Sequence, residues 1–186
     1  SILVNPTPDI NITVSGTNPI CQGQDSELFF PVISGTPPFN VNYLAGGSPL
    51  TTNVDGSGNQ TSGNPMIISP TTTTTYTLTS VTDAKGCFNS LSNNATLTVN
   101  EIPNVIVSGD TEICNQDQTP LFFTFTSGTA PWTVNYNVAS APGSVTLYNT
   151  NDTLVVDPNI TTTYMFTGIS DNNCSATINE DVTITV

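Results

Sequence analysis

Histidine and arginine are absent from this sequence, and lysine occurs once, at Lys85, against 14 acidic residues. Without histidine, neither a Ser–His–Asp triad nor a Cys–His pair can form, so nucleophilic catalysis of these kinds is excluded. A net charge of −13 repels phosphate groups, which excludes nucleic acid and anionic membrane surfaces as partners. No apolar run approaches the about 20 residues that cross a bilayer, so we expect no membrane insertion. We therefore expect a protein that is not an enzyme and has no cofactor.

A repeat is the strongest positive feature. The segment SGTNPICQGQDSELFFPVISGTPPFNVNY begins at Ser15, and SGDTEICNQDQTPLFFTFTSGTAPWTVNY begins at Ser108, at a constant offset of 93 residues. A second match joins PTTTTTYTLTSVTDAKGC, which ends at Cys87, to PNITTTYMFTGISDNNC, which ends at Cys174. Repeats of this length indicate tandem copies of one small domain. We place repeat 1 at residues 6–100 and repeat 2 at residues 101–186, and interpret residues 1–5 as the tail of a preceding repeat.

Alternating apolar and polar residues predict strands, and helix signals are nearly absent. The alternation puts Leu28 and Phe30 on one face of a strand, and Leu121 and Phe123 answer them in the second copy. The predicted fold is all-β, with two tandem Ig-like antiparallel sandwiches. The predicted strands are 10–14, 27–33, 39–44, 49–54, 61–68, 75–82 and 94–100 in copy one, and 104–108, 121–126, 132–137, 144–149, 153–156, 163–170 and 181–186 in copy two. A glycine- and asparagine-rich surface loop is expected at residues 55–64.

The four cysteines occupy equivalent places in the two copies. Repeat symmetry favours the disulfides Cys21–Cys87 and Cys114–Cys174, one in each sandwich. A zinc site is the alternative, but the chain has no histidine and no C-x-x-C pair. Paired cysteines in small domains indicate an oxidising compartment, so we expect an exported, extracellular protein.

The sequence resembles a family of repeats. SG-x(4)-C, the Phe-rich strand, SGT-x-P-(W/F)-x-V-x-Y, P-x(2)-TTTY and the late cysteine are similar to the Ig-like tandem repeats of large Bacteroidetes cell-surface proteins. Such repeats occur in adhesins of gliding motility and in other proteins secreted by the type IX pathway. The resemblance implies a stalk or adhesive repeat on the cell surface. Because the first cysteine precedes the Phe-rich strand, the disulfide is expected near one end of each sandwich.

Calcium is the one metal that the acidic residues suggest. Glu101, Asp110 and Glu112 lie near the junction of the copies, and Asp83 and Asp171 occupy equivalent turns. Calcium takes six to eight oxygen ligands, often from carboxylates. No EF-hand spacing is present, so solvated surface acids are the simpler interpretation.

Exposed aromatic side chains are what a carbohydrate site would require. Trp132 has Phe39 at its equivalent position and both lie on an apolar face, which favours a core role. Tyr148 and Phe88 have no aromatic counterparts and are the better surface candidates. Thr153, in Asp-Thr-Leu, resembles the O-glycosylation acceptor of Bacteroidetes exports.

Three functions are open at this point. The first is a pair of non-catalytic modules from a long bacterial surface protein. The second is a building block of an extracellular filament, and the third is a carbohydrate-binding accessory module of a secreted enzyme. The expected partners are neighbouring repeats of the same chain, with surface polysaccharide or other protein chains as further candidates.

Overall fold

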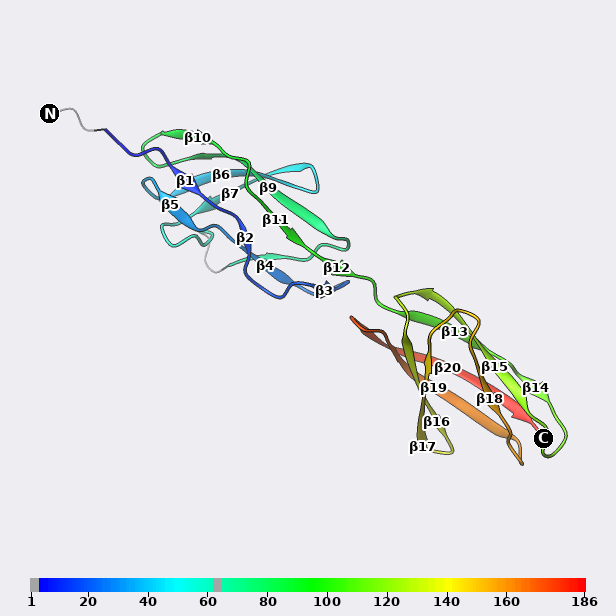
Figure 1. The fold of residues 1–186 in the computed structure, drawn as a ribbon. Helices are drawn as coiled ribbons and strands as arrows, with labels where there is room; N and C mark the ends of the chain where they lie inside the picture. The colour runs from blue at the N-terminus through cyan, green and yellow to red at the C-terminus, as the bar shows by residue number, and fades with distance from the viewer. Residues whose placement is uncertain (1–3, 62–64) are drawn as a thin grey trace. The chain divides into compact units, whose positions relative to one another are not determined.

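The computed structural model describes residues 4–61 and 65–186. In these ranges every element of regular structure is a β-strand (Figure 1). The chain divides into two compact units, Ser1–Val99 and Asn100–Val186, which we call repeat 1 and repeat 2. The boundary falls one residue before the predicted one. Among the described residues, no helix is long and apolar enough to cross a membrane. Of the predicted tail at residues 1–5, residues 1–3 lie outside the described ranges.

Repeat 1 is an antiparallel sandwich. Its larger sheet has the order β10–β9–β6–β7, with β11 also paired to β9, and its smaller sheet has the order β2–β4–β8. Two short pairs, β1–β5 and β12–β3, complete the unit. The strands are β1 (Asp9–Ile10), β2 (Thr13–Val14), β3 (Ile20–Cys21), β4 (Ser26–Phe29), β5 (Val32–Ser34), β6 (Phe39–Ala45), β7 (Ser48–Val54), β8 (Met66–Ile68), β9 (Thr74–Thr82), β10 (Phe88–Ser90), β11 (Asn94–Leu97) and β12 (Val99–Asn100).

Repeat 2 has the same plan with longer strands. Its sheets have the orders β14–β20–β19–β16–β17 and β13–β15–β18, and only the β14–β20 pair is parallel. The strands are β13 (Asn104–Ser108), β14 (Thr111–Glu112), β15 (Thr119–Ser127), β16 (Trp132–Val138), β17 (Ala141–Leu147), β18 (Thr153–Val156), β19 (Thr162–Ser170) and β20 (Ser175–Thr185). The predicted all-β, Ig-like sandwich fold is confirmed.

The alternation of the sequence places the core between the two sheets of each repeat. In repeat 1, Phe30 and Tyr43 face each other across the sandwich with ring centroids 5.9 Å apart. In repeat 2, Phe123 and Phe166 make an edge-to-face pair at 5.7 Å. These rings are almost fully buried, so aromatic pairs of the favoured geometry lie at the centre of each core.

A proline divides one strand of repeat 1 that is continuous in repeat 2. Pro31 separates β4 from β5, whereas Thr124 at the equivalent position continues β15. Proline has no N–H to donate to a sheet. The neighbouring Phe30 N–H donates instead to the carbonyl oxygen of Gly58 at 3.2 Å. The loop at residues 55–60 therefore binds at the broken strand, while residues 62–64 of the predicted loop lie outside the described ranges.

Candidate functional site at the ends of each repeat

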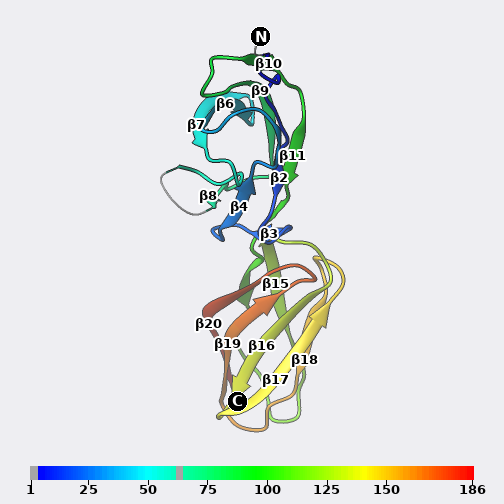
Figure 2. The same ribbon diagram turned by 90° about the vertical axis from the view of Figure 1, so that its left-hand side faces the viewer.

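Each repeat has two distinct ends, and the Ser-Gly-Thr motif and the turn of the late cysteine lie at one of them. In repeat 1 the strands β1, β5 and β10 lie at the end where the chain enters, and β3 and β12 lie at the opposite end (Figures 1 and 2). We call these the entry end and the exit end. The entry end of repeat 1 contains the linker residues Thr7–Pro8, the Ser-Gly-Thr loop at residues 34–36 and the turn at residues 83–87.

Every residue of the first Ser-Gly-Thr loop has a role at the entry end. The Ser34 hydroxyl donates to the carbonyl oxygen of Thr7 at 2.7 Å. Gly35 has φ +111°, and a Cβ there would lie 3.0 Å from the Cα of the buried Pro8. The Thr36 N–H donates to Asp83 Oδ2 at 3.1 Å. The loop thus binds the incoming linker on one side and the aspartate turn on the other.

The second repeat makes the same three contacts. The Ser127 hydroxyl donates to the carbonyl oxygen of Ile102 at 2.6 Å. A Cβ on Gly128 would lie 2.6 Å from the Cβ of Pro103, and the Thr129 N–H donates to Asp171 Oδ2 at 2.9 Å. The geometry recurs although the surrounding residues differ, so it belongs to the repeat and not to one copy.

The aspartate of each turn also holds the late cysteine. Asp83 Oδ1 accepts the N–H of Cys87 at 3.0 Å, and Asp171 Oδ1 accepts the N–H of Cys174 at 2.8 Å. Desolvation raises the pKa of Asp83, but the N–H donors of Thr36, Cys87 and Lys85 outweigh it and hold that pKa below its ordinary value of 3.8. In the same way, backbone donors lower the pKa of Asp171 against the effect of desolvation.

We predict that Asp171→Asn lowers the stability of repeat 2 at neutral pH by about 1–2 kcal/mol, because three N–H groups lose a charged acceptor in a partly solvated site. A carboxyl whose pKa is lower in the folded state stabilises the fold above its unfolded pKa, and this contribution disappears as the pH falls through the folded pKa. The wild-type advantage should therefore shrink below pH 3.8. Trp132, the only tryptophan, reports repeat 2 in urea titrations at several pH values.

Asp117→Asn is the matched control, since Asp117 is exposed in the same repeat. It removes the same charge and should follow the wild-type pH profile. If the Asp171→Asn profile runs parallel to the wild type down to pH 2, the aspartate turn does not make the predicted contribution.

The predicted disulfide pairings are wrong. Cys21 and Cys174 are disulfide-bonded, whereas Cys87 and Cys114 are free thiols. The reason is that the two cysteines of one repeat lie at opposite ends. Cys174 is in the β19–β20 hairpin at the entry end, and Cys114 follows β14, which pairs with the far end of β20 at Ile184. Ten residues of strand span roughly 33 Å, and a disulfide needs Cα atoms within about 7 Å.

The same separation holds in repeat 1. Ile20 next to Cys21 donates its N–H to Thr98 at the exit end, while Cys87 is held by Asp83 at the entry end. The length of β9 lies between them. Each repeat therefore has one cysteine near each end, and the expected disulfide near one end of each sandwich does not form. Repeat symmetry identified equivalent cysteines without showing which of them are neighbours.

The calcium candidates do not gather into one site. Glu101 precedes β13 at the entry end of repeat 2, whereas Asp110 and Glu112 follow that strand at the exit end. Asp110 Oδ1 accepts the N–H of Thr183 at 2.7 Å. Among the described residues, no group of three His, Cys, Asp or Glu side chains is placed to hold a metal ion. Asp83 and Asp171 bind backbone N–H groups instead.

The aromatic side chains divide as the sequence indicated. Phe39 and Trp132 are buried in the cores, and Trp132 stacks on Phe125 with centroids 3.9 Å apart. Phe88 and Tyr148 are 61% and 67% exposed but belong to different repeats, so they form no platform within one repeat. Sequence reasoning missed Phe122, which is half exposed on the outer face of β15. Its place between the inward-facing residues of the Leu-Phe-Phe triplet was the available signal.

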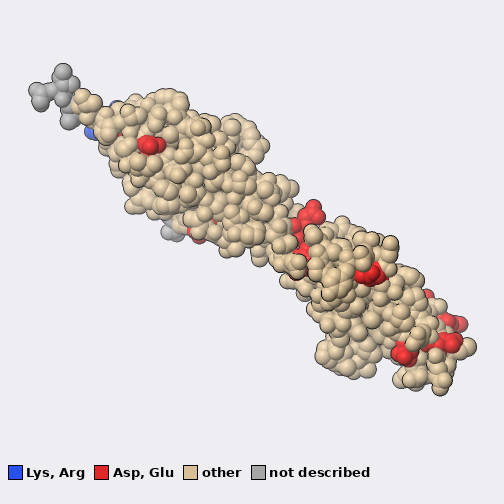
Figure 3. Space-filling model, in the orientation of Figure 1, with Lys and Arg blue, Asp and Glu red and all other residues tan. Residues whose placement is uncertain are grey.

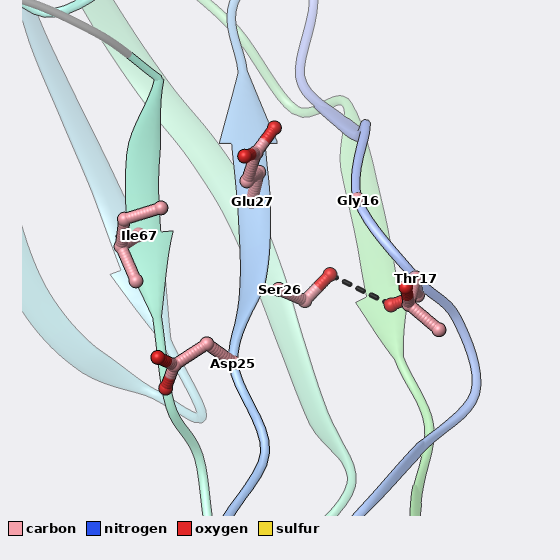
Figure 4. Close-up of a pocket in the computed structure, with 6 residues that line it drawn as sticks. All are labelled: Gly16, Thr17, Asp25, Ser26, Glu27 and Ile67. Carbon is pink, nitrogen blue, oxygen red and sulfur yellow. Dashed lines mark hydrogen bonds between the residues drawn. The ribbon is translucent and has the colours of Figure 1, made fainter.

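One surface hollow of repeat 1 is small, and a second is uncharged. The one in Figure 4 has a volume of about 190 Å³, and within it the Ser26 hydroxyl donates to the carbonyl oxygen of Thr17 at 2.7 Å. Ligand pockets usually measure about 300–1,000 Å³. A wider recess of about 410 Å³ lies beside Tyr43, Met66 and Tyr76, and no charged residue lines it.

In repeat 2, a recess of about 280 Å³ lies beside Phe122, and Thr153 is part of its wall. Thr153 is exposed at the start of the edge strand β18. Its glycosylation stays a prediction. On the face drawn in Figure 3, most of the surface is uncharged and the carboxylates form separate small groups.

No protein-family model matches the chain, and no curated protein matches it. Among solved structures, it is similar to one described as "Biofilm associated protein - BSP domain", at 14% sequence identity and a TM-score of 0.30. The similarity covers 96% of this chain but only 29% of that one.

Proposed function

We propose that the chain is a pair of non-catalytic structural repeats of a longer bacterial cell-surface protein, where it acts as a stalk or adhesive repeat. The observation that carries this proposal is the entry end. In both repeats the Ser-Gly-Thr loop binds the preceding linker through a hydroxyl–carbonyl hydrogen bond and a glycine–proline contact. A repeat that holds its own linker in a defined position is suited to serial use in a rod.

Two further observations support this function. Cys21 and Cys174 are disulfide-bonded, which favours an oxidising, extracellular location. The wider recess of repeat 1, beside Tyr43, Met66 and Tyr76, has no charged residue in its lining that could act as a general acid or base. The motif resemblance to Bacteroidetes surface repeats supports the finer assignment to adhesins of the gliding-motility type.

Antibodies raised against this chain test the location. We expect them to label intact source cells, and we expect external protease to abolish the labelling while a cytoplasmic marker protein stays intact. Labelling that requires permeabilised cells would contradict the proposal. Electron microscopy of the labelled material then separates the two surface roles, since regular lateral contacts between chains would favour the filament over the stalk.

A further inference from the structure

Two thiols, Cys87 and Cys114, are free in the described chain. Cys87 is half-buried in the aspartate turn at the entry end of repeat 1. Cys114 is exposed at the exit end of repeat 2, where the Ile113 N–H donates to the carbonyl oxygen of Thr185 at 2.9 Å. One free thiol thus lies at an entry end, and the other lies at an exit end.

The repeat counterparts of both free thiols are disulfide-bonded. Cys174 occupies in repeat 2 the position that Cys87 occupies in repeat 1, and Cys21 occupies in repeat 1 the position of Cys114. The bonded cysteines are therefore also one from an entry end and one from an exit end. Both kinds of position consequently engage in disulfides in this protein.

The turn around Cys87 is one residue longer than the turn around Cys174, but both make the same aspartate contact. The N–H of Cys87 donates to Asp83 Oδ1 at 3.0 Å, as the N–H of Cys174 donates to Asp171 Oδ1 at 2.8 Å. Asp83 also accepts the N–H of Thr36, which ties the turn to the Ser-Gly-Thr loop. The backbone of Cys87 is thus held at the entry end by the same aspartate contact as that of its bonded counterpart.

We propose that Cys114 at the exit end forms a disulfide with Cys87 at the entry end of a further copy of the repeat. Repeats would then be joined head to tail by a covalent bond between their ends as well as by the polypeptide. The inference rests on the proposed function in one respect, because in serial repeats the chain leaves each repeat at its exit end and enters the next at its entry end. At such a joint the reaction is intramolecular and gains from a high effective concentration.

The bond forms by thiol–disulfide exchange with a disulfide oxidant such as glutathione disulfide. The Cys114 thiolate attacks one sulfur of the oxidant, forms a mixed disulfide and releases one glutathione thiolate. The Cys87 thiolate of the further copy attacks the Cys114 sulfur of this mixed disulfide and releases the second glutathione. The two cysteine thiols together lose two protons and two electrons; the oxidant takes up both electrons, and its two released thiolates take up both protons to give two glutathione molecules.

The test uses the full chain as Cys87→Ser and Cys114→Ser variants, of which one carries a size tag. Each variant has a single free thiol, and both are incubated with glutathione disulfide, separately and mixed. We expect the mixture to yield the mixed dimer well above statistical proportion, with homodimers a minor product in every incubation. The wild-type chain should form a ladder of oligomers that a reductant removes, while each variant alone should not extend beyond dimers.

A matched control gives the rate of unspecific pairing. Thr150→Cys in the Cys87→Ser/Cys114→Ser background presents an exposed thiol in a loop of repeat 2. It should pair with the Cys114→Ser variant several-fold more slowly than the Cys87→Ser variant does. Mass spectrometry after cleavage at aspartate must identify the Cys87–Cys114 bond, since the single lysine makes trypsin unsuitable.

Equal yields of homodimers and mixed dimers, or a mixed dimer no faster than the control, would overturn the proposal. Either result would leave the surface-repeat function untouched, since labelling of intact cells does not depend on these thiols. If the thiols pair selectively but intact cells are not labelled, the disulfide proposal stands and the surface-repeat function is contradicted.

Discussion

Replacing Phe39 by alanine should unfold repeat 1 under conditions where repeat 2 stays folded. Phe39 is fully buried at the start of β6, beside the Ser-Gly-Thr loop. Removing a buried phenylalanine costs about 3–5 kcal/mol through lost burial and the cavity that remains. That is a large part of the roughly 5–15 kcal/mol that stabilises a small domain.

Two optical signals separate the repeats in this experiment. Trp132 belongs to repeat 2, so its fluorescence follows that repeat alone, while far-UV circular dichroism follows both. In urea, Phe39→Ala should move only the circular dichroism transition of repeat 1 to lower denaturant. Phe88→Ala removes the same ring from a site that is 61% exposed and should change stability by less than about 0.5 kcal/mol. An equal shift of the tryptophan signal would contradict the assignment of Phe39 to an independent core.

Alanine at Gly35 should destabilise repeat 1 by on the order of 2–4 kcal/mol. Two costs combine there. The φ of +111° is unfavourable for any side chain, and the new Cβ would lie 2.7 Å from Phe39 Cε1 and 3.0 Å from the backbone of Pro8. Relieving these contacts requires the linker to move away from the entry end.

Gly86→Ala separates the two costs. Gly86 has φ +79° in the aspartate turn of the same repeat, but its Cβ would meet nothing within 4 Å. Only the backbone strain remains, so we expect a loss of about 1 kcal/mol. Denaturant midpoints of both variants give the comparison. Equal losses at Gly35 and Gly86 would show that contact with the linker proline does not stabilise the entry end.

The long strands of both repeats were predictable because their signal is local, whereas the short strands β3, β10 and β14 were not predicted. Each strand of a sandwich has one face toward the core and one toward solvent. Phe39, Val41 and Tyr43 therefore alternate with asparagines in the sequence. A second copy with the same alternation confirmed each assignment. The division of a strand at Pro31 was harder to foresee, because it depends on a loop carbonyl from residue 58.

The role of Asp83 and Asp171 was not found from the sequence, although their equivalence was. Their pattern in the sequence is compatible with calcium as well, since a carboxylate in a turn is suited to either a cation or an N–H donor. The deciding donors, Thr36 and Thr129, lie more than 40 residues away in the chain. The sequence shows that the two threonines occupy equivalent positions in their repeats, but it does not show that their N–H groups bind the aspartates.

The sequence alone determined that the protein is an all-β pair of repeats with an acidic surface, because composition and periodicity act residue by residue. Only the tertiary structure decided what the repeated residues do. It placed the two cysteines of a repeat at opposite ends of β20 or β9, where a bond between them is geometrically impossible. It also joined serine, glycine and threonine of one loop to a linker and an aspartate. The sequence shows which positions of the two repeats are equivalent, whereas only the fold shows which residues are close together in space.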